Sequence, residues 1–170
     1  SDNYTTKLIA QDLISNPKFS YIRLDRDKLP NLETDLTETE YKDGYKIFGK
    51  FSPEKKILIS HGKIFHDCFN IYKKNKEKAV CINLFKSKPF PKKLIEILKR
   101  SQKILVVDEQ TPSGNLGSCV FENLSDKNIF PKIKTLSLDN QYIFDNGGRS
   151  YLLNKYGLSE DNINQALEKL

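Results

Sequence analysis

The sequence predicts an α/β protein, a three-layer α/β/α sandwich built on a five-stranded, mostly parallel mixed sheet. Two observations support this class. Short apolar runs rich in β-branched residues, such as KILIS at 56–60 and ILVV at 104–107, are typical of parallel strands covered on both faces. Amphipathic stretches of about ten residues separate these runs, and strands that alternate with such helices form parallel βαβ units.

Residues 1–44 differ in composition from the rest of the chain. The apolar spacing predicts a short helix over 5–15, ended by an Asn-Pro pair, and an alternating pattern predicts a strand over 19–24. Residues 25–46 are rich in acids and poor in β-branched residues, which predicts a connecting segment. We therefore place a domain boundary within this segment and expect a second domain over 45–170.

Strands and helices alternate regularly within the second domain. Strands are predicted over 45–51, 56–60, 79–85, 104–108 and 133–138, and helices over 64–76, 91–100, 115–124, 147–156 and 159–170. The first two strands are expected to be antiparallel neighbours, which would make the sheet mixed. Ser159 stands at the N-cap of the last helix, where its hydroxyl can accept a hydrogen bond from a free backbone amide.

The charge balance raises the question of a nucleic-acid partner. The chain has 28 Lys and Arg against 22 Asp and Glu, a net charge of +6. Only four of the cations are Arg and no groove-reading motif accompanies them, so we expect a solvated lysine surface and no nucleic acid. No apolar stretch approaches the roughly twenty residues that span a membrane, so no membrane partner is expected either.

The residues that most often carry chemistry are sparse. The chain has three widely spaced cysteines, Cys68, Cys81 and Cys119. They predict reduced core thiols in a cytoplasmic protein. Neither His61 nor His66 has a second ligand at useful spacing, so no metal site is expected. Ser60 and Ser118 lack the GxSxG context of a nucleophile elbow, and we expect no catalytic residue on this chain.

The loop that follows the apolar run at 104–107 is the first candidate for function. Ligands and partner surfaces collect at the carboxyl edge of open α/β sheets, which is where Asp108 and Glu109 fall. Adjacent residues of a strand point to opposite faces, so these acids cannot work as a pair on one substrate. We expect one to bridge an interface and the other to accept from amides of the loop. Gly114 and Gly117 either shape this loop for contact or serve only the turn into the next helix.

Two arginines stand at the end of the strand predicted over 19–24. A guanidinium at a strand's carboxyl end can hold a phosphate through two hydrogen bonds, so Arg23 and Arg26 are candidate substrate-binding residues. Salt bridges to the neighbouring Asp25 or Asp27 are the alternative. Residues 145–149 form a Gly-rich turn that ends in Arg149, and helix entry is the preferred interpretation because the phosphate-loop pattern is absent.

Five segments together resemble the transketolase family, in the family's order and over about residues 18–170. They are YIRLDRDKLP at 21–30, KKILISHGKIFHDCFNIYKK at 55–74, AVCINLFKSKPFPKKLIEIL at 79–98, KILVVDEQTPSGNLGSCVFENL at 103–124 and FDNGGRSYLLNKYGLSEDNI at 144–163. The first is similar to the end of the family's pyrimidine-binding domain, with its Arg-x-x-Leu-Pro motif. The others are similar to its C-terminal domain.

The resemblance implies a C-terminal fragment of a thiamine diphosphate enzyme that transfers a two-carbon ketol unit between sugar phosphates. The family's C-terminal sheet has five strands, the first of them antiparallel. The motifs that bind thiamine diphosphate and Mg²⁺ lie upstream of anything present here, so the fragment is expected to bind no cofactor and to be inactive alone. Its partners would be the remaining domains or subunit, in a homodimer. By motif match Arg26 would hold the substrate phosphate, with Arg23 as runner-up.

Other identities stay open at this point. The chain departs from the family where Asp108-Glu109 replaces two glutamates and where Ser113-Gly114 replaces two glycines, which leaves the subfamily undecided. It could be the corresponding part of a deoxyxylulose-phosphate synthase or of a 2-oxoacid dehydrogenase E1 beta subunit. A free-standing flavodoxin-like binding or regulatory module is the alternative outside the family.

Overall fold

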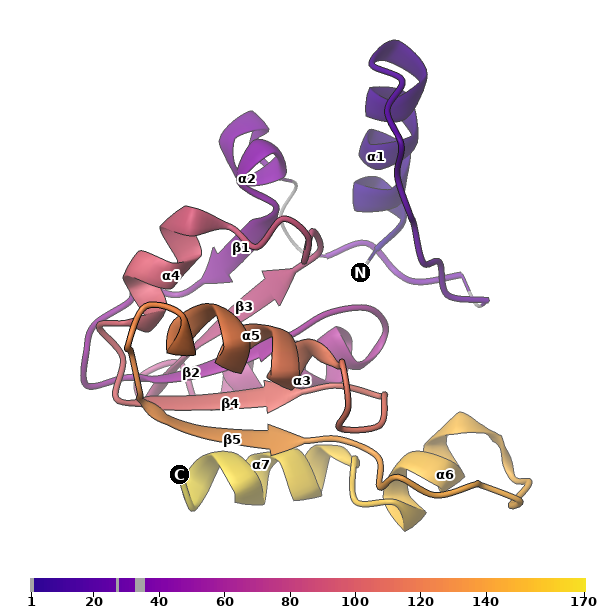
Figure 1. The fold of residues 1–170 in the computed structure, drawn as a ribbon. Coiled ribbons are helices and arrows are strands. Elements are labelled where there is room, and N and C mark those ends of the chain that lie inside the picture. The colour runs from indigo at the N-terminus through magenta and orange to yellow at the C-terminus, as the bar shows by residue number, and fades with distance from the viewer. Residues whose placement is uncertain (1, 27, 33–35) are drawn as a thin grey trace.

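A computed structural model describes residues 2–26, 28–32 and 36–170 as a five-stranded sheet with helices on both faces (Figure 1). The strands are β1 (Tyr45–Phe48), β2 (Lys56–Ser60), β3 (Ala79–Leu84), β4 (Lys103–Val107) and β5 (Lys132–Leu136). The helices are α1 (Asn3–Ser15), α2 (Glu38–Asp43), α3 (Ile64–Lys74), α4 (Lys92–Leu98), α5 (Leu116–Ser125), α6 (Gly148–Lys155) and α7 (Glu160–Glu168). The predicted α/β class is confirmed.

The strand order is β1-β3-β2-β4-β5, with β1 antiparallel and every other pair parallel. The sheet is therefore mixed, as predicted. The expectation that 45–51 and 56–60 are antiparallel neighbours was wrong, because β1 pairs with β3 and not with β2. The connection between β1 and β2 is longer than a tight hairpin turn, which leaves β1 free to pair with the far side of β3.

Each face of the sheet has its own apolar core. Leu58 and Leu105 point toward α3 and α7 in one cluster, and the flanking Ile57, Ile59 and Val106 point toward α4 and α5 in the other. This split follows from the period of two in a strand, which sends neighbouring side chains to opposite faces. Because β2, β3 and β4 are buried on both faces, their sequences are continuous apolar runs.

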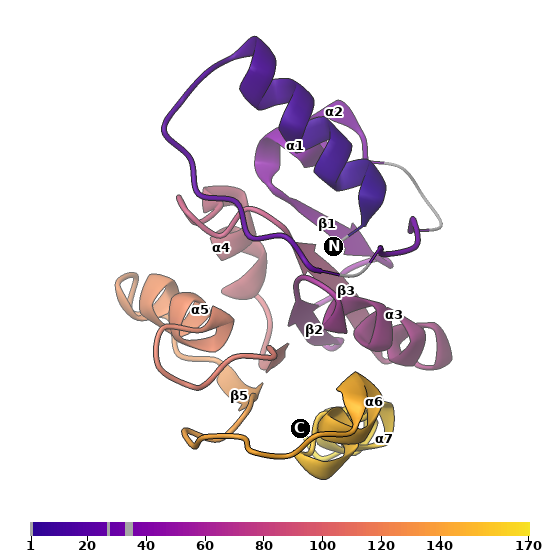
Figure 2. The same cartoon turned by 90° about the vertical axis from the view of Figure 1, so that its right-hand side faces the viewer.

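Helix α1 and the segment that follows it stand apart from the sheet (Figures 1 and 2). Helix α1 is held through its N-cap Asp2, which accepts from Thr5 N and from Leu32 N, and through Asp12, which accepts from the Tyr41 hydroxyl at 2.9 Å. The connecting segment predicted over 25–46 contains a helix that was not anticipated. Thr37 and Glu40 form a capping box at the start of this helix, α2.

The strand predicted over 19–24 is not formed. These residues are exposed and belong to no strand, and Phe19 and Tyr21 are among the most exposed apolar side chains, at 107% and 89%. A strand needs a neighbour for its backbone hydrogen bonds, and the described part of the chain offers none to these residues.

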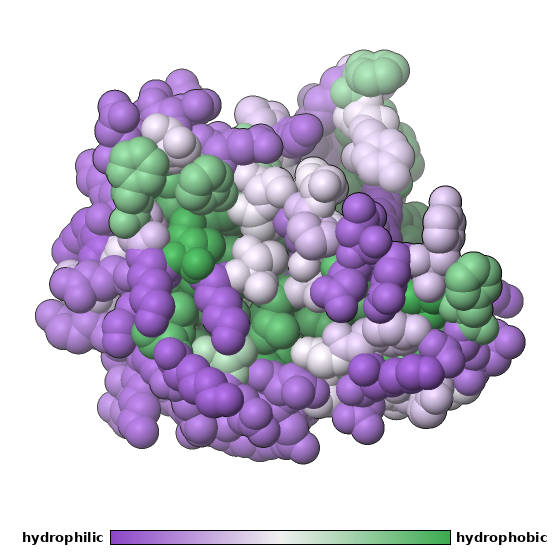
Figure 3. Space-filling model, turned by 60° about the horizontal axis from the view of Figure 1, so that its bottom comes forward, coloured by the Kyte–Doolittle hydropathy of each residue, from purple (hydrophilic) through white to green (hydrophobic). Residues whose placement is uncertain are grey.

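The opposite end of the molecule also presents apolar side chains. In Figure 3, where the bottom of Figure 1 comes forward, apolar side chains lie together at the surface and hydrophilic side chains surround them. Large apolar residues exposed in the last third of the chain include Phe121, Phe130, Tyr142, Phe144 and Tyr151. Among the described residues, no helix has the length and apolar character required to cross a membrane.

Candidate functional site

The carboxyl edge of the sheet brings two titratable residues together. Ser60 and Val107 are the paired last residues of the parallel neighbours β2 and β4, so the residues that follow them, His61 and Asp108, emerge side by side. His61 Nε2 lies 3.2 Å from Asp108 Oδ1. The Ser60 hydroxyl donates to the Val107 carbonyl oxygen at 2.8 Å and ties the two strand ends together.

The Asp108 carboxylate has a partner on each oxygen. Oδ1 faces His61, and Oδ2 accepts from the backbone N–H of Leu116 at 2.8 Å, at the start of α5. Burial alone would raise the pKa of this carboxyl, which is 2% exposed, but His61, the Leu116 amide and the charge of Arg23 together outweigh it and lower the pKa. Asp108 is therefore an ionised, fully engaged acceptor.

The adjacent Glu109 joins a different network. Its Oε1 lies 2.5 Å from Arg149 of α6, and Arg149 also reaches Asp67 of α3 at 3.5 Å. Burial raises the pKa of both Glu109 and Asp67, and Arg149 offsets only part of that effect. Asp108 accepts from a backbone amide of the loop, whereas Glu109 pairs with Arg149 of the same chain. The interface role of the loop residues Asp108, Glu109, Gly114 and Gly117 stays a prediction. Arg149, at the first turn of α6, serves this ion-pair network.

The loop between Asp108 and α5 is shaped by its own residues. Asn115 caps α5 by accepting from Ser118 N at 3.0 Å, and the Ser118 hydroxyl donates to the Pro112 carbonyl oxygen. Gly114 has φ +73°, which favours glycine. Gly117 lies where a Cβ would come within 2.7 Å of Thr135 Cγ2 in β5. The two glycines thus serve the turn and the close packing of α5 on β5.

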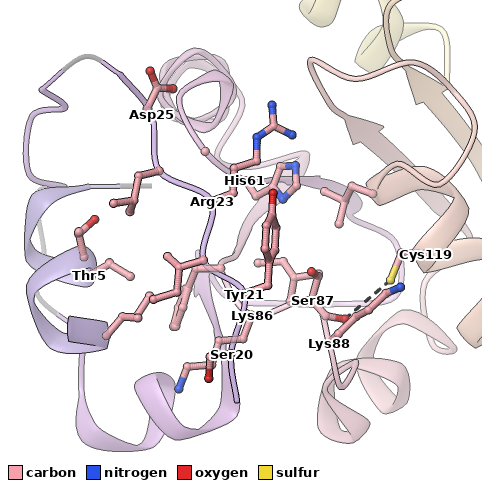
Figure 4. Close-up of a pocket in the computed structure, with 18 of the residues that line it drawn as sticks. Thr5, Ser20, Tyr21, Arg23, Asp25, His61, Lys86, Ser87, Lys88 and Cys119 are labelled. Carbon is pink, nitrogen blue, oxygen red and sulfur yellow. Dashed lines mark hydrogen bonds between the residues drawn. The ribbon is translucent and has the colours of Figure 1, made fainter. Parts of the chain in front are cut away.

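An open cleft of about 1010 Å³ separates the sheet edge from the N-terminal part. Its lining includes Arg23, Arg26, His61, Asp108 and Glu109, which places both candidate arginines and both acids of the edge on one cleft. Figure 4 shows Tyr21 and Arg23 extending from the N-terminal segment into the region of His61, with Lys86, Ser87, Lys88 and Cys119 on the far side.

The structure describes only one of the two aspartates that could form salt bridges with Arg23 and Arg26. The partner Asp27 lies outside the described residues. Asp25 lines the same cleft as Arg23 and acts electrostatically on Glu109. The substrate-binding role of Arg23 and Arg26 stays a prediction.

The hydroxyl, imidazole and thiol side chains considered as nucleophiles are hydrogen-bonded to other groups or buried. The Ser60 and Ser118 hydroxyls both donate to backbone carbonyls, and His61 faces a carboxylate. Cys68 and Cys81 are buried free thiols whose pKa values are raised by desolvation, which keeps them protonated. Cys119, predicted to be a core thiol, is only half-buried and lines the cleft.

The pairing of His61 with Asp108 was missed in the sequence. A signal did exist, because a titratable residue directly follows each of two apolar strand runs. The sequence does not show that these two strands are neighbours in the sheet, so the contact between His61 and Asp108 could not be predicted from it.

Comparisons with known proteins agree with this architecture. Residues 52–163 match the model of the family described as "Transketolase, C-terminal domain". The protein named 1-deoxy-D-xylulose-5-phosphate synthase of Clostridium beijerinckii is 34% identical over 114 residues, which is 66% of this chain and 18% of that protein. The protein of the same name from Caldanaerobacter subterraneus subsp. tengcongensis is 29% identical over 98 residues, or 57% of this chain and 16% of that protein.

Solved structures share the fold. One described as "Split gene transketolase, inactive beta4 tetramer" superposes with a TM-score of 0.82 at 20% identity and covers 99% of this chain and 55% of that one. A transketolase variant from Pichia stipitis, in a structure described as a complex with xylulose 5-phosphate, gives a TM-score of 0.57 at 15% identity, over 85% of this chain and 20% of that one. The chain thus spans less than a fifth of the curated relatives.

Proposed function

The chain belongs to the transketolase C-terminal domain family, and from that membership we propose that it is the C-terminal part of a cytoplasmic, thiamine diphosphate-dependent transketolase-like enzyme. The complete enzyme would move a two-carbon ketol unit between sugar phosphates. Residues 45–170 would pack against the other domains and support a homodimer, and residues 1–44 would be the tail end of a pyrimidine-binding domain and a linker. The family match over 52–163 is the observation that carries this proposal.

The exposed N-terminal segment supports the incomplete-domain interpretation. If residues 17–26 were a strand, Phe19 and Tyr21 would lie on one face and Ile22 and Leu24 on the other. All four side chains are exposed. Apolar side chains on both faces are typical of a strand inside a sheet that is covered on both sides. The missing strands would come from the rest of the pyrimidine-binding domain.

The cofactor is assigned to those missing parts. In the portions of the chain that the structure describes, no group of three or more His, Cys, Asp or Glu side chains could hold a metal ion. From the family resemblance, the Mg²⁺ diphosphate centre would lie in the other domains, and no step of the reaction is placed on these residues. When bound elsewhere in the enzyme, thiamine diphosphate would supply the electron sink for the ketol carbanion.

Calorimetry tests this division of labour directly. Thiamine diphosphate with Mg²⁺, titrated into the isolated chain, should give no binding heat. The same titration into the chain assembled with its remaining domains or subunit should give binding and sugar-phosphate turnover. Micromolar binding to the isolated chain, or turnover by it alone, would contradict the proposal.

Arg26 is proposed to hold the phosphate of the substrate, with Arg23 beside it. In the assembled enzyme Arg26→Ala should raise KM for phosphorylated sugars on the order of tenfold or more, because a hydrogen-bonded charge contact contributes about 1.5–3 kcal/mol. Unphosphorylated sugars should be spared. Arg100→Ala, which removes a cation that stacks on Phe51, is the control. Equal losses on both kinds of sugar would refute the role.

A deoxyxylulose-phosphate synthase is the second candidate. Both curated relatives carry that name, the first at 34% identity. Product analysis of the assembled enzyme separates the two, since a transketolase passes the ketol unit between sugars whereas the synthase forms deoxyxylulose 5-phosphate.

A further inference from the structure

Strand β5 is the open edge of the sheet. Its residues Lys132, Lys134 and Thr135 are exposed and its other two are half-buried, whereas β1 at the opposite edge buries three of its four residues. Figure 2 shows β5 last in the sheet, with α5 toward one face and α7 toward the other. An uncovered edge strand presents unpaired backbone N–H and C=O groups, to which another strand can be added.

The backbone hydrogen bonds show which groups of β5 are open. Lys132 N donates to the Gln102 carbonyl oxygen, and the Leu136 carbonyl oxygen accepts from the amide that follows β4, so the even-numbered residues of β5 face β4. Successive residues of a strand direct their backbone groups to opposite sides. The N–H and C=O groups of Ile133 and Thr135 therefore point away from β4, and none of the described residues forms a hydrogen bond with them.

The side chains of β5 divide by charge between the two faces. Thr135 meets α5 at Gly117, and Ile133 packs on the apolar core of the same face. Lys132 lies on the other face, where its Nζ donates at 3.2 Å to a backbone carbonyl oxygen after the end of α7. Lys134 shares that face because it lies two residues further along the strand. The edge thus has two cations toward α7 and two uncharged β-branched side chains toward α5.

The charge along this edge has one sign. Residues 127–138 contain three lysines, Lys127, Lys132 and Lys134, and no acid. Lys103 of β4 lies directly beside Lys132 in the register and adds to the positive potential. Lys134 is exposed and has no hydrogen bond or ion pair with any other described residue. Its charge is therefore available to a partner.

A second copy of this chain fits the edge poorly. Antiparallel pairing of β5 with itself about Ile133 or Lys134 would place lysines directly opposite lysines, and like charges in that position destabilise a sheet. Lysines on an edge strand commonly protect a protein from such self-association. A strand with acids at the same positions would instead meet opposite charges, so the edge is complementary to an acidic partner.

The start of the edge also offers an apolar contact. Phe130, two residues before β5, is 68% exposed. Together with Lys132 it lines an open hollow of about 320 Å³. A segment that runs along β5 and past its first residue would reach this hollow.

We propose that the open edge of β5 binds an extended acidic segment of a partner protein as an added strand. The backbone of the segment bonds to Ile133 and Thr135, and acids at every second position face Lys132 and Lys134. The side chains between those acids are small or apolar and lie toward α5. The proposal does not rest on the thiamine enzyme assignment, because it concerns a surface that the chain presents by itself.

Nuclear magnetic resonance of the full chain tests the edge with a defined probe, the blocked peptide Glu-Val-Glu-Val-Glu. Its titration should saturably shift the amide resonances of Ile133 and Thr135 and slow their hydrogen exchange. The amides of Lys132 and Lys134, which already face β4, should change much less in exchange rate. The peptide Lys-Val-Lys-Val-Lys has the same pattern with the opposite charge and should bind about tenfold more weakly or worse. Equal binding of both peptides, or shifts that are centred elsewhere, would overturn the proposal.

A reversal of charge on β5 identifies the lysine contact. Lys134→Glu should weaken binding of the acidic peptide roughly fivefold and strengthen binding of the basic peptide, because one cross-strand pair exchanges attraction for repulsion. Lys50→Glu makes the same change of charge at an exposed position after β1, at the opposite edge of the sheet. This control should leave both affinities nearly unchanged. Equal effects of the two variants would mean a non-specific attraction to positive charge and would rule out the strand site.

The backbone contact is tested at Thr135. Thr135→Pro removes the N–H that points to the open side, and an edge strand tolerates proline at such a position because no hydrogen bond to its neighbour is lost. The acidic peptide should no longer bind, whereas Thr135→Ala, which keeps the amide, should bind it like the unaltered chain. Should Thr135→Pro fail to fold, the charge reversal at Lys134 and the shifts of Ile133 decide the matter. Binding retained by a folded Thr135→Pro variant would contradict an added strand.

The same spectra distinguish the other occupant of the edge. Without peptide, the hydrogen exchange of Ile133 and Thr135 should not depend on the concentration of the chain. Protection of these two amides that rises with chain concentration would show that a second copy pairs with β5, and would overturn the assignment to an acidic partner.

Discussion

Asp108 and Glu109 are adjacent in the chain but belong to different electrostatic environments. Burial opposes the charged form of both. For Asp108 the His61 ring, the Leu116 amide and Arg23 outweigh burial, whereas for Glu109 the single Arg149 does not. The same chemical group is therefore a firmly ionised acceptor at one position and a more readily protonated one at the next.

Removing Arg149 should destabilise the protein by an amount that depends on pH. Arg149→Gln leaves Asp67 and Glu109 as two partly buried carboxylates without their cation, and we expect a loss of about 1–3 kcal/mol in the free energy of unfolding at pH 7. Both carboxyls have raised pKa values, so they protonate as pH falls, and the loss should shrink toward pH 4. Urea unfolding at the two pH values measures this.

The control for that experiment is an exposed ion pair. Lys42 lies at the surface beside Glu38, and Lys42→Gln should change stability little at either pH. A deficit in Arg149→Gln that is equal at both pH values would show that the network is not the cause.

Asp108 should also contribute less stability at low pH, although its pKa is shifted in the opposite direction. Its folded pKa is lowered, so its ionised form contributes stability above the unfolded value near 4, and this contribution is lost as pH falls through the folded pKa. Asp108→Asn should cost about 1–2 kcal/mol at pH 7 and less at pH 3. Asp139→Asn, at an exposed position, is the matched control for denaturant unfolding. A cost that grows on acidification would reverse the argument.

Helix α5 and strand β5 approach each other where only glycine fits. A Cβ at Gly117 would meet both Thr135 Cγ2 and Thr135 Oγ1, and the Asn115 side chain that caps α5 is close by. Gly117 lies within α5, so the requirement comes from tertiary packing and not from an unusual backbone angle. The helix entrance that follows Asp108 thus depends on its contact with the edge strand.

The contact between Gly117 and Thr135 can be tested with one destabilising substitution and a second one that restores stability. Gly117→Ala should destabilise the protein by about 1–3 kcal/mol through overpacking. Thr135→Ala removes the two atoms that the new methyl group would meet, so the double variant should recover most of the loss, with Thr135→Ala alone as the control. Thermal unfolding of the four proteins forms the cycle, and purely additive effects would rule out the contact.

At the scale of the whole molecule, stability is concentrated in the sheet and the helices that cover it. The two apolar cores draw nearly all their residues from Tyr45 onward, and Leu32 is the only earlier member among the described residues. Helix α2 is fastened to this body by the ion pairs Lys46–Glu40 and Lys93–Asp43. Helix α1 instead depends on a few polar contacts.

A shortened chain tests that distribution. Residues 37–170 should unfold cooperatively, with a midpoint within a few degrees of the full chain, because they retain α2 and every member of the two cores except Leu32. Hydrogen exchange of the full chain should show α1 opening with much less protection than β2, β3 and β4. A shortened chain without a cooperative transition would mean that the N-terminal part is integral to the folding unit.

The sequence by itself determined the class of the fold and the elements from β1 to α7, because the periods of strands and helices are local properties that apolar spacing records. It also indicated Asp108 and Glu109 as residues of the sheet edge. Only the tertiary structure decided that β1 pairs with β3, that residues 19–24 form no strand, and that His61 meets Asp108. These features depend on which strands are neighbours, and a pairing between distant segments leaves no periodic trace in either of them.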